Sequence, residues 1–418
     1  MSAFKFSKLD CFLTYVGLTF LLSDIGLDIW TAVSLYQEED YVYLGILIFA
    51  LLGSSMLSQA YSWLWYTYDD FVRVTKVERC LSLRQLKAMH FLQLGVYFRH
   101  AGVVEITSCG CIAKTQDPVD AAVFLTHDLS MLRLIEAFSE SAPQLVLMLT
   151  IMLQRGQLDP LTVLKALGST SAIAFSVTTY QRSLRSFLPD KEEQGIGSSL
   201  IYFIWNLLLI FSRLAAIALF ASILPCFVFT HFICSWMLLF FCAWRSKTSF
   251  MDSPGGEWLY QATVALIWYF DWFNVVDDRT RYKTTLYHGF ILLDISLICG
   301  LWCWRMQTQS ASFKVPLLYA CIIAFSVVAF YIFGLILKII YYKCFHPNLT
   351  KKELRGDSTS ASEKAVMFSA SSVVVEDSVH HISDRRYTIE DGVDGAVSHA
   401  DTRFSNKRMR KLAENFYT

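Results

Sequence analysis

A long apolar stretch from His127 to Leu153 carries charges that a membrane-spanning helix ordinarily excludes. It is long enough to cross a bilayer as a helix, which takes about 20 residues. At about 100° per residue, its polar side chains share an arc of roughly 80°, and they are Arg133, Glu136, Glu140 and Gln144. Leucine, isoleucine and phenylalanine cover most of the remaining surface. Such a helix must hide one polar stripe from the lipid tails.

This polar stripe has two explanations. Each charge near the centre of a bilayer costs about 2.5–3.5 kcal/mol to insert, so other helices must supply partners or the stripe must line a wet cavity. The stripe is therefore either part of a polar pathway through the membrane or part of a buried salt-bridge network that only holds helices together. Composition alone favours neither explanation.

Apolar segments recur along most of the chain and set its class. Hydrophobic side chains make up 54% of the sequence, which is above the usual range for soluble domains. The long apolar runs predict an all-α polytopic membrane protein. The formal net charge of +0 gives no reason to expect a nucleic-acid partner. Ten apolar segments cover about residues 11–34, 41–65, 81–98, 127–153, 161–186, 198–224, 227–244, 257–276, 286–304 and 316–341.

The first apolar segment also carries acidic residues at helical spacing. Asp10, Asp24 and Asp28 share an arc of about 80°, and the first and last lie about 27 Å apart along a helix, nearly the thickness of the hydrocarbon core. Alternatively, Asp10 is interfacial and the other two form one buried site. We expect the intramembrane charges to face the protein interior and to form at least two acid–base contacts. The other charged residues in this expected set are Arg182, Arg185, Arg213 and Asp294.

Two segments are poor candidates for complete spans. The segment 81–98 is short and carries three basic side chains, and the segment 257–276 is interrupted by Asp271. If both enter the membrane and return on the same side, Lys and Arg concentrate in the cytosolic connections, as the positive-inside rule requires. This arrangement predicts eight transmembrane helices plus two re-entrant helices, with both termini cytosolic. It also predicts two pseudo-repeated halves, at about 1–186 and 198–343.

Six stretches from the first apolar segment to the last form a characteristic set, and several of them include charged residues inside helices. The stretches are SDIGLDIW at 23–30, DLSMLRLIEAFSESAPQLVLMLTIMLQ at 128–154, SLRSFLPDK at 183–191, SSLIYFIWNLLLIFSRLAAIALF at 198–220, EWLYQATVALIWYFDWFN at 257–274 and YYKCFHPN at 341–348. Together they resemble the XK-related family of membrane proteins. The resemblance implies the same fold of eight spanning and two re-entrant helices in two related halves.

The resemblance also implies a function. It implies that the chain is a caspase-activated phospholipid scramblase of the plasma membrane. Such a protein moves lipids passively in both directions and exposes phosphatidylserine on the outer leaflet during apoptosis. The resemblance implies no cofactor and no ATP hydrolysis. The implied partners are membrane phospholipids including phosphatidylserine, an executioner caspase, and a single-span immunoglobulin-family chaperone of the basigin or neuroplastin type.

The composition changes after the helical membrane domain predicted for residues 1–343. Residues 344–418 are rich in Ser, Asp, Glu, Lys and Arg, which is typical of a mostly disordered cytosolic tail. Near its end, 405–417 is predicted to form a basic helix. We expect this helix to dock on the membrane domain and inhibit it, unless it stays disordered or lies on anionic lipid. Its apolar face includes Met409, Leu412 and Phe416.

A protease site is predicted between the membrane domain and this basic helix. Asp391 and Asp394 form the D-x-x-D pattern that executioner caspases prefer, and Gly395 supplies a small residue after the cut. The surrounding segment has few large apolar residues, so we expect it to enter a protease cleft in an extended form. One cut there would release the basic helix. Alternative cuts after Asp357 or Asp377 lack the first aspartate of the pattern.

The sequence shows no motif for covalent chemistry. We find neither a P-loop nor a G-x-S-x-G elbow and no metal-ligand pattern, so we predict that the protein is not an enzyme. Two rivals to a passive scramblase remain. One is an ion-coupled transporter or channel, because intramembrane acids also serve ion paths. The other is a non-conducting scaffold whose charges are purely structural.

Overall fold

The computed structural model describes residues 8–69, 71, 73, 75–110, 116–156, 160–187, 194–246, 248, 250–274, 280–308 and 316–345. These residues all belong to one compact unit. The tail residues singled out from the sequence lie outside the described residues, and they are Asp391, Asp394, Gly395, Met409, Leu412 and Phe416.

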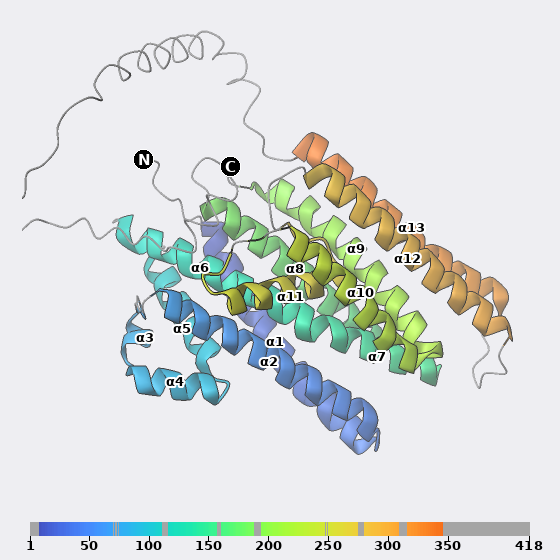
Figure 1. The fold of residues 1–418 in the computed structure, drawn as a ribbon, viewed down its shortest axis with the longest axis horizontal. Helices are drawn as coiled ribbons and strands as arrows, with labels where there is room; N and C mark the ends of the chain where they lie inside the picture. The colour runs from blue at the N-terminus through green and yellow to red at the C-terminus, as the bar shows by residue number, and fades with distance from the viewer. Residues whose placement is uncertain are drawn as a thin grey trace, which may run out of the picture. The chain divides into compact units, whose positions relative to one another are not determined.

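Helices make up all the regular structure of the described residues (Figure 1). The elements up to the middle of the chain are α1 Lys8–Gln37, α2 Tyr41–Tyr68, α3 Lys76–Arg79, α4 Leu83–Phe91, α5 Gly95–Gly110, α6 Gln116–Glu136, the π-helix η1 Ala137–Ser141, α7 Ala142–Arg155 and α8 Pro160–Phe187. The later elements are α9 Ile196–Ile223, α10 Pro225–Arg245, α11 Pro254–Phe270, α12 Thr280–Thr308, α13 Leu317–Ile340 and the π-helix η2 Tyr341–Phe345.

Seven helical stretches within the described residues are long and apolar enough to cross a membrane. The chain is therefore a polytopic membrane protein of all-helical class. Helix α8 has 28 residues and is not in this group. The count of eight spanning and two re-entrant helices stays a prediction. The seven stretches are Leu9–Gln37, Tyr41–Tyr68, Ala122–Arg155, Ile196–Ile223, Pro225–Arg245, Tyr282–Thr308 and Leu317–Phe345.

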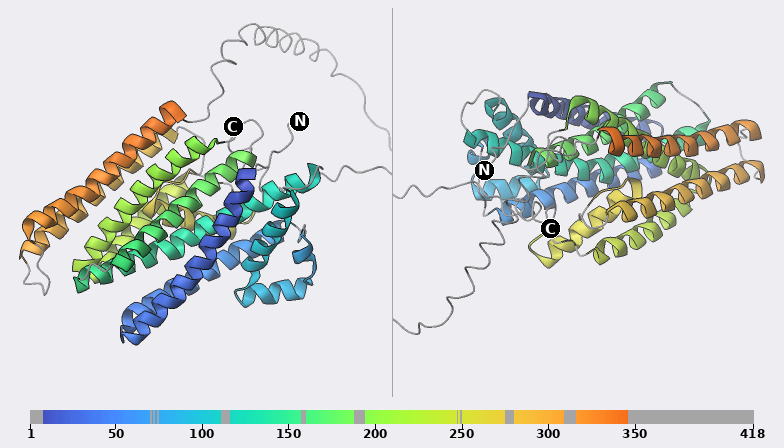
Figure 2. Two further views of the ribbon diagram at one scale, coloured as in Figure 1. Left: turned by 180° about the vertical axis from the view of Figure 1, so that it is seen from behind. Right: turned by 90° about the horizontal axis from the view of Figure 1, so that it is seen from above.

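Helix α9 is the centre of the packing. It has the largest share of buried residues among the seven candidate spans, and it packs against α7, α8, α12 and α13. Its contact with α13 is close because Gly334 leaves room for Leu209: a Cβ at position 334 would lie 2.8 Å from the Leu209 Cδ2 atom. Figure 2 shows α1, in dark blue, on an outer face of the bundle, where it contacts α2, α5 and α8.

Both segments that the sequence marks as poor spans are broken or short. The predicted segment 81–98 is not one helix, because α4 ends at Phe91 and α5 starts at Gly95. Between them, Gln93 has a positive φ of 63°, a conformation that ends a helix. In the second half, α11 has 17 residues and ends at Phe270, with Asp271 in an extended conformation. Both helix ends therefore lie inside stretches of apolar sequence.

Candidate functional site

The helix predicted over 127–153 is interrupted at its centre. Residues 137–141 form a π-helical turn, in which the Ala142 N–H donates to the Ala137 carbonyl. Pro143 explains the interruption: it lacks an N–H, and its ring would clash with the carbonyl four residues earlier, at Ser139, in a regular α-helix. A single extra residue in the turn relieves this conflict, and such turns are frequent at functional sites.

The π-helical turn places polar side chains against α1 and α2. The Ser141 hydroxyl donates to the Asp24 carboxylate over 3.1 Å, and Ser139 shares a hydrogen bond of 2.8 Å with Ser54. Asp28, which is 7% exposed, lies beside Glu140. The four acids that the sequence placed on two stripes therefore meet in one acidic cluster, and its members are Asp24, Asp28, Glu136 and Glu140.

Arg133 is the base next to this acidic cluster. Its Nη1 atom lies 4.0 Å from Glu136 Oε2, and the two side chains are 15% and 24% exposed. The apolar neighbours Leu132, Leu134 and Phe138 are at most 1% exposed. The charged stripe therefore lies on the more accessible face of this helix, and the apolar face packs into the protein.

An ion pair ties α1 to α8 at the other end of the polar stripe. The Arg182 Nη2 atom lies 2.8 Å from Asp10 Oδ1. Arg182 also donates to the Ser199 hydroxyl over 2.6 Å and to the Gln194 carbonyl. Because Arg182 is 5% exposed, α8 supplies a buried cation to the acid of α1.

Two small cavities join this ion pair to Arg133. The larger measures about 50 Å³ between α1, α5, α6 and α8, and the smaller, of about 20 Å³, reaches Asp10 and Arg182. Both are lined by Thr14, Thr126 and Thr179. We call the whole arrangement the polar seam, and it comprises Asp10, Thr14, Asp24, Asp28, Thr126, Ser130, Arg133, Glu136, Glu140, Thr179 and Arg182.

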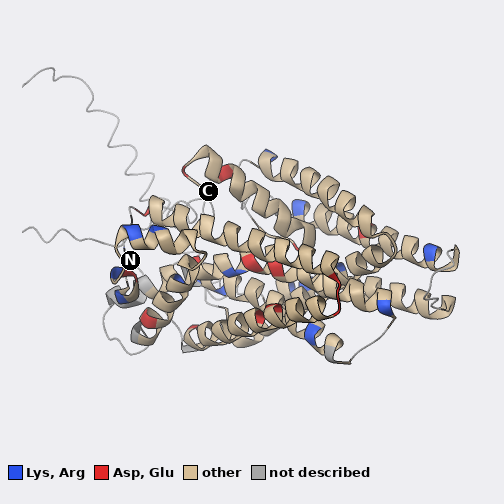
Figure 3. Ribbon diagram, turned by 90° about the horizontal axis from the view of Figure 1, so that it is seen from below, with Lys and Arg blue, Asp and Glu red and all other residues tan. Residues whose placement is uncertain are grey.

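The polar seam alternates in charge along its length. It starts with the Asp10–Arg182 pair, passes a stretch of hydroxyl groups to Arg133, and ends at the acidic cluster. His100 also lines the larger cavity, where burial and the nearby Arg133 lower the pKa of His100 to about 3, so its ring is neutral at physiological pH. Figure 3 shows acidic and basic positions along the length of the helices as well as at their ends.

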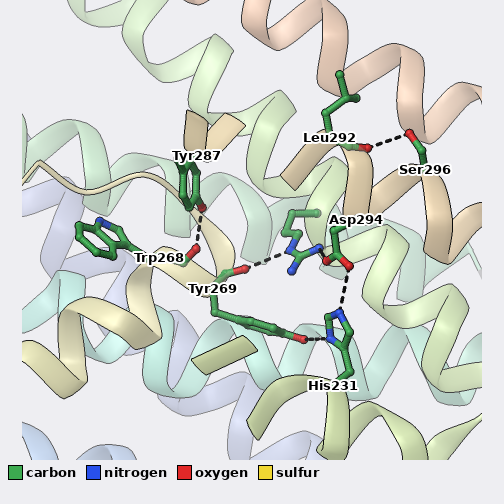
Figure 4. Close-up of polar contacts among 8 residues, drawn as sticks. His231, Trp268, Tyr269, Tyr287, Leu292, Asp294 and Ser296 are labelled. Atoms are coloured by element: carbon green, nitrogen blue, oxygen red, sulfur yellow. Dashed lines mark hydrogen bonds and ion pairs between the residues drawn. The ribbon is translucent and has the colours of Figure 1, made fainter. Parts of the chain in front are cut away.

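Arg213 and Asp294 lie outside the polar seam, in a network of the second half (Figure 4). The Arg213 Nη1 atom lies 2.5 Å from Asp294 Oδ2, and its Nε–H donates to the Tyr269 carbonyl over 3.0 Å. That carbonyl belongs to the last turn of α11, whose carbonyls have no partner within the helix. The buried guanidinium therefore neutralises the end of a helix that stops inside the fold.

Sequence reasoning missed a histidine that completes this network. His231 on α10 lies 3.2 Å from Asp294 Oδ1 through Nε2 and 3.0 Å from the Tyr269 hydroxyl through Nδ1. Asp294 thus contacts side chains from two other helices, Arg213 of α9 and His231 of α10. The sequence held one signal that could have indicated this contact: His231 lies within the otherwise apolar segment 227–244.

A second missed cluster surrounds Lys338 of α13. Its Nζ atom lies 2.7 Å from His288 Nε2, and the other nitrogen of His288 lies 2.9 Å from the Tyr331 hydroxyl. Asp271, just after α11, is within electrostatic reach of Lys338. The signal was a lone lysine in an apolar run. Like Arg213, Lys338 therefore lies near the residues at which α11 ends.

The remaining predicted base and one further ion pair also lie away from the polar seam. Arg185 is buried near Tyr341 and Tyr342 at the end of the α13 helix. Arg99 of α5 lies 3.6 Å from Asp128 of α6 and donates to the Ser62 hydroxyl of α2 over 2.8 Å. These contacts join helices.

Metal binding finds no support in the described part of the chain. Across the ranges given above, no group of three or more His, Cys, Asp or Glu side chains is placed to hold a metal ion.

The comparison with protein families assigns the chain. The family described as XK-related protein matches residues 12–347, which include every residue of the polar seam except Asp10. The chain belongs to the XK-related family. It is 41% identical over 360 residues to XK-related protein 8 of Tetraodon nigroviridis, covering 85% of this chain and 87% of the relative. It is 37% identical over 350 residues to XK-related protein 8 of Pan troglodytes, covering 81% and 84%. The resemblance noted in the sequence is confirmed.

Proposed function

We propose that this XK-related protein is a passive phospholipid scramblase. The observation that carries the proposal is the polar seam, which extends from Asp10 to Asp28 over about 27 Å of helix, close to the thickness of the hydrocarbon core. Some of its charges are partly accessible, such as Arg133 and Glu136 at 15% and 24% exposure, so a phospholipid head group finds polar contacts at successive depths while its tails remain in lipid. This process needs no covalent chemistry, and we propose that the protein is not an enzyme.

The proposed topology has eight spanning helices and two re-entrant ones. The seven apolar candidates supply seven spans, and α8 becomes the eighth because Thr179 and Arg182 face the polar seam and not lipid. The α4–α5 turn and the end of α11 are then the re-entrant points, which membranes tolerate where protein surrounds the backbone. The proposed location is the plasma membrane with both termini cytosolic, and the proposed halves are residues 1–186 and 198–343.

The proposed regulation rests on the sequence and on the family. An executioner caspase cuts after Asp394 and releases the basic helix at 405–417, which otherwise inhibits the membrane domain. Phosphatidylserine then reaches the outer leaflet as an apoptotic signal. A single-span chaperone of the basigin or neuroplastin type is the proposed partner.

Reconstitution in liposomes tests the proposed function. Fluorescent lipid in both leaflets is bleached from outside, with the protein truncated before Phe404. A scramblase brings inner-leaflet lipid to the bleaching agent, so bleaching goes beyond half of the dye. Ion flux without lipid exchange would instead indicate the transporter or channel, and the absence of both would indicate a scaffold. The matched control is Asp394→Ala in full-length protein treated with caspase, which should stay uncut and inactive.

A further inference from the structure

Three buried polar atoms, on residues that line the larger cavity of the polar seam, have no hydrogen-bond partner. They are Arg133 Nη1, Thr126 Oγ1 and Thr179 Oγ1, and all three residues line that cavity. Buried polar groups are almost always paired, and a donor left without an acceptor destabilises the fold. Three such groups around one cavity therefore indicate a place for an acceptor.

Neighbouring hydroxyl groups show that these threonines are unusual. Thr170 and Thr178 also lie on α8, and each donates to the carbonyl four residues earlier, over 2.7 and 2.8 Å. Thr179 makes no such bond. The other hydroxyls that line the larger cavity donate to backbone carbonyls, and they belong to Thr14, Ser130 and Ser176.

The charge of the cavity selects an anion. Of the described residues that line it, none is Asp or Glu, and Arg133 is the one that carries a charge at neutral pH. The 4.0 Å contact between Arg133 Nη1 and Glu136 is too long for a hydrogen bond. The guanidinium therefore keeps a donor free, and its charge points to a ligand with negatively charged oxygens.

We propose that this cavity is a phosphate-binding site through which lipid head groups pass, with Arg133, Thr126 and Thr179 as its donors. Arginine binds phosphate through paired N–H groups more specifically than lysine does. A water occupies about 10–15 Å³ of such volume, so a cavity of about 50 Å³ holds several waters or a group of phosphate size. Phosphate is shared by all glycerophospholipids, so the site serves them without choosing a head group. This proposal deepens the proposed scramblase function and rests on it.

Direct binding to purified full-length protein tests the site. The protein is kept in a phosphate-free buffer and a detergent without phosphate, and is titrated separately with glycerophosphocholine and with inorganic phosphate. The two probes distinguish a phosphodiester head group from free phosphate. Binding is read from microscale thermophoresis. We expect the double variant T126V with T179V to bind glycerophosphocholine about tenfold more weakly, because two hydrogen bonds are lost.

Arg133 gives a second, stronger test. R133Q removes the charge and should weaken binding by about 10- to 100-fold, because a charge-assisted hydrogen bond contributes more than a neutral one. R133K keeps the charge and should retain part of the affinity. The matched control is T170V with T178V, which removes two hydroxyls from α8 that do not line the cavity; its affinity should equal that of the wild type.

Each binding result either supports or overturns the phosphate site. Glycerophosphocholine binding that falls in T126V with T179V, but not in the control, supports the site. Binding of inorganic phosphate alone overturns the assignment to lipid head groups. Equal binding by wild type and by T126V with T179V, or no binding of either probe, overturns the site altogether. If the double variant does not fold, T126V and T179V are tested singly, each with an expected loss of about threefold.

This test is independent of transport. A wild-type protein that binds glycerophosphocholine through these donors but does not exchange lipid in liposomes refutes the proposed function and leaves the phosphate site standing. A protein that exchanges lipid but binds the probe equally well without the three donors refutes the phosphate site and leaves the scramblase standing.

Discussion

The charged side chains discussed above fall into two groups, the polar seam and the network around Asp294, and they differ in their partners. Arg213 is 1% exposed and contacts a helix-end carbonyl, whereas Glu136 is 24% exposed beside a cavity-lining arginine. Helical spacing predicted which acids share a face of one helix. It could not predict the partner of Arg213, because the contact with Asp294 joins residues 81 positions apart and depends on tertiary packing.

Removing the Arg213 side chain should destabilise the whole membrane domain. Arg213→Ala strands the Asp294 carboxylate and uncaps the last turn of α11, and breaking a buried pair in this way costs about 3–5 kcal/mol. We expect a large drop in the midpoint of thermal unfolding, measured by fluorescence-detected size-exclusion chromatography. Arg245→Ala, at an exposed helix end, is the control and should unfold at the wild-type temperature.

Neutralising an acid of the polar seam should leave the stability unchanged and slow lipid exchange. Glu140 lies near three other acids, Glu136, Asp28 and Asp24, so Glu140→Gln keeps the size of the side chain and adds no like charge to the cluster. We expect an unfolding midpoint no lower than that of the wild type, with lipid exchange slowed at least about tenfold if a charge-assisted contact to the head group is lost. A midpoint that falls as far as in Arg213→Ala would identify the acidic cluster as a structural network.

At the scale of elements, the sequence predicted most helices and the interruption at Asp271, but not the π-helical turn or the break between α4 and α5. The helix around 127–153 was expected, yet it begins at Gln116 and contains a π-helical turn at 137–141. Pro143 carried a signal for that turn, but a proline equally often ends or kinks a helix. The break between α4 and α5 was also hidden, because Leu92 and Leu94 continue the apolar pattern across it.

The close crossing of α9 and α13 yields a prediction about packing. In Gly334→Ala the new Cβ would lie 2.8 Å from the Leu209 Cδ2 atom, and overpacking of this kind destabilises by about 1–3 kcal/mol. Leu209→Ala in the same chain removes the clashing atoms. We therefore expect the double variant to lose less stability than the sum of the single variants, measured as unfolding midpoints in one detergent.

Gly300 supplies the control for this double-variant comparison. It lies on α12 with no atom within 4 Å of an added Cβ, so Gly300→Ala should be neutral or stabilising by up to about 1 kcal/mol through helix propensity. Strictly additive losses in Gly334→Ala with Leu209→Ala would mean that the two helices do not meet at these residues.

At the scale of the whole molecule, the family and the helical membrane class followed from the sequence, while the arrangement did not. Apolar runs predicted where most of the long helices lie, since length and composition decide whether a helix suits a bilayer. They could not show that α9 is the central helix. They also could not show that Arg182 of α8 reaches Asp10 of α1, because both facts depend on contacts between distant segments.

Two native cysteines test the topology directly. Cys226 lies at the start of α10 and Cys80 directly after α3, and both are exposed. With eight spanning and two re-entrant helices, Cys226 is outside the cell and Cys80 is in the cytosol. If all ten apolar segments crossed, Cys226 would move to the cytosol while Cys80 would stay there. Cys226 therefore discriminates between the two topologies, and Cys80 is a fixed reference.

Single-cysteine variants at these positions are treated in intact cells with a membrane-impermeant maleimide. We expect labelling at Cys226 and none at Cys80, and labelling of both after the membrane is permeabilised. Protection of Cys226 in intact cells, with labelling only after permeabilisation, would require the α4–α5 segment to cross the membrane, and a cytosolic C-terminus would then require α11 to cross as well. The α4–α5 turn and the end of α11 would then no longer be re-entrant points, and the charges around Arg213 and Lys338 would need an explanation other than neutralising a helix that stops within the bilayer.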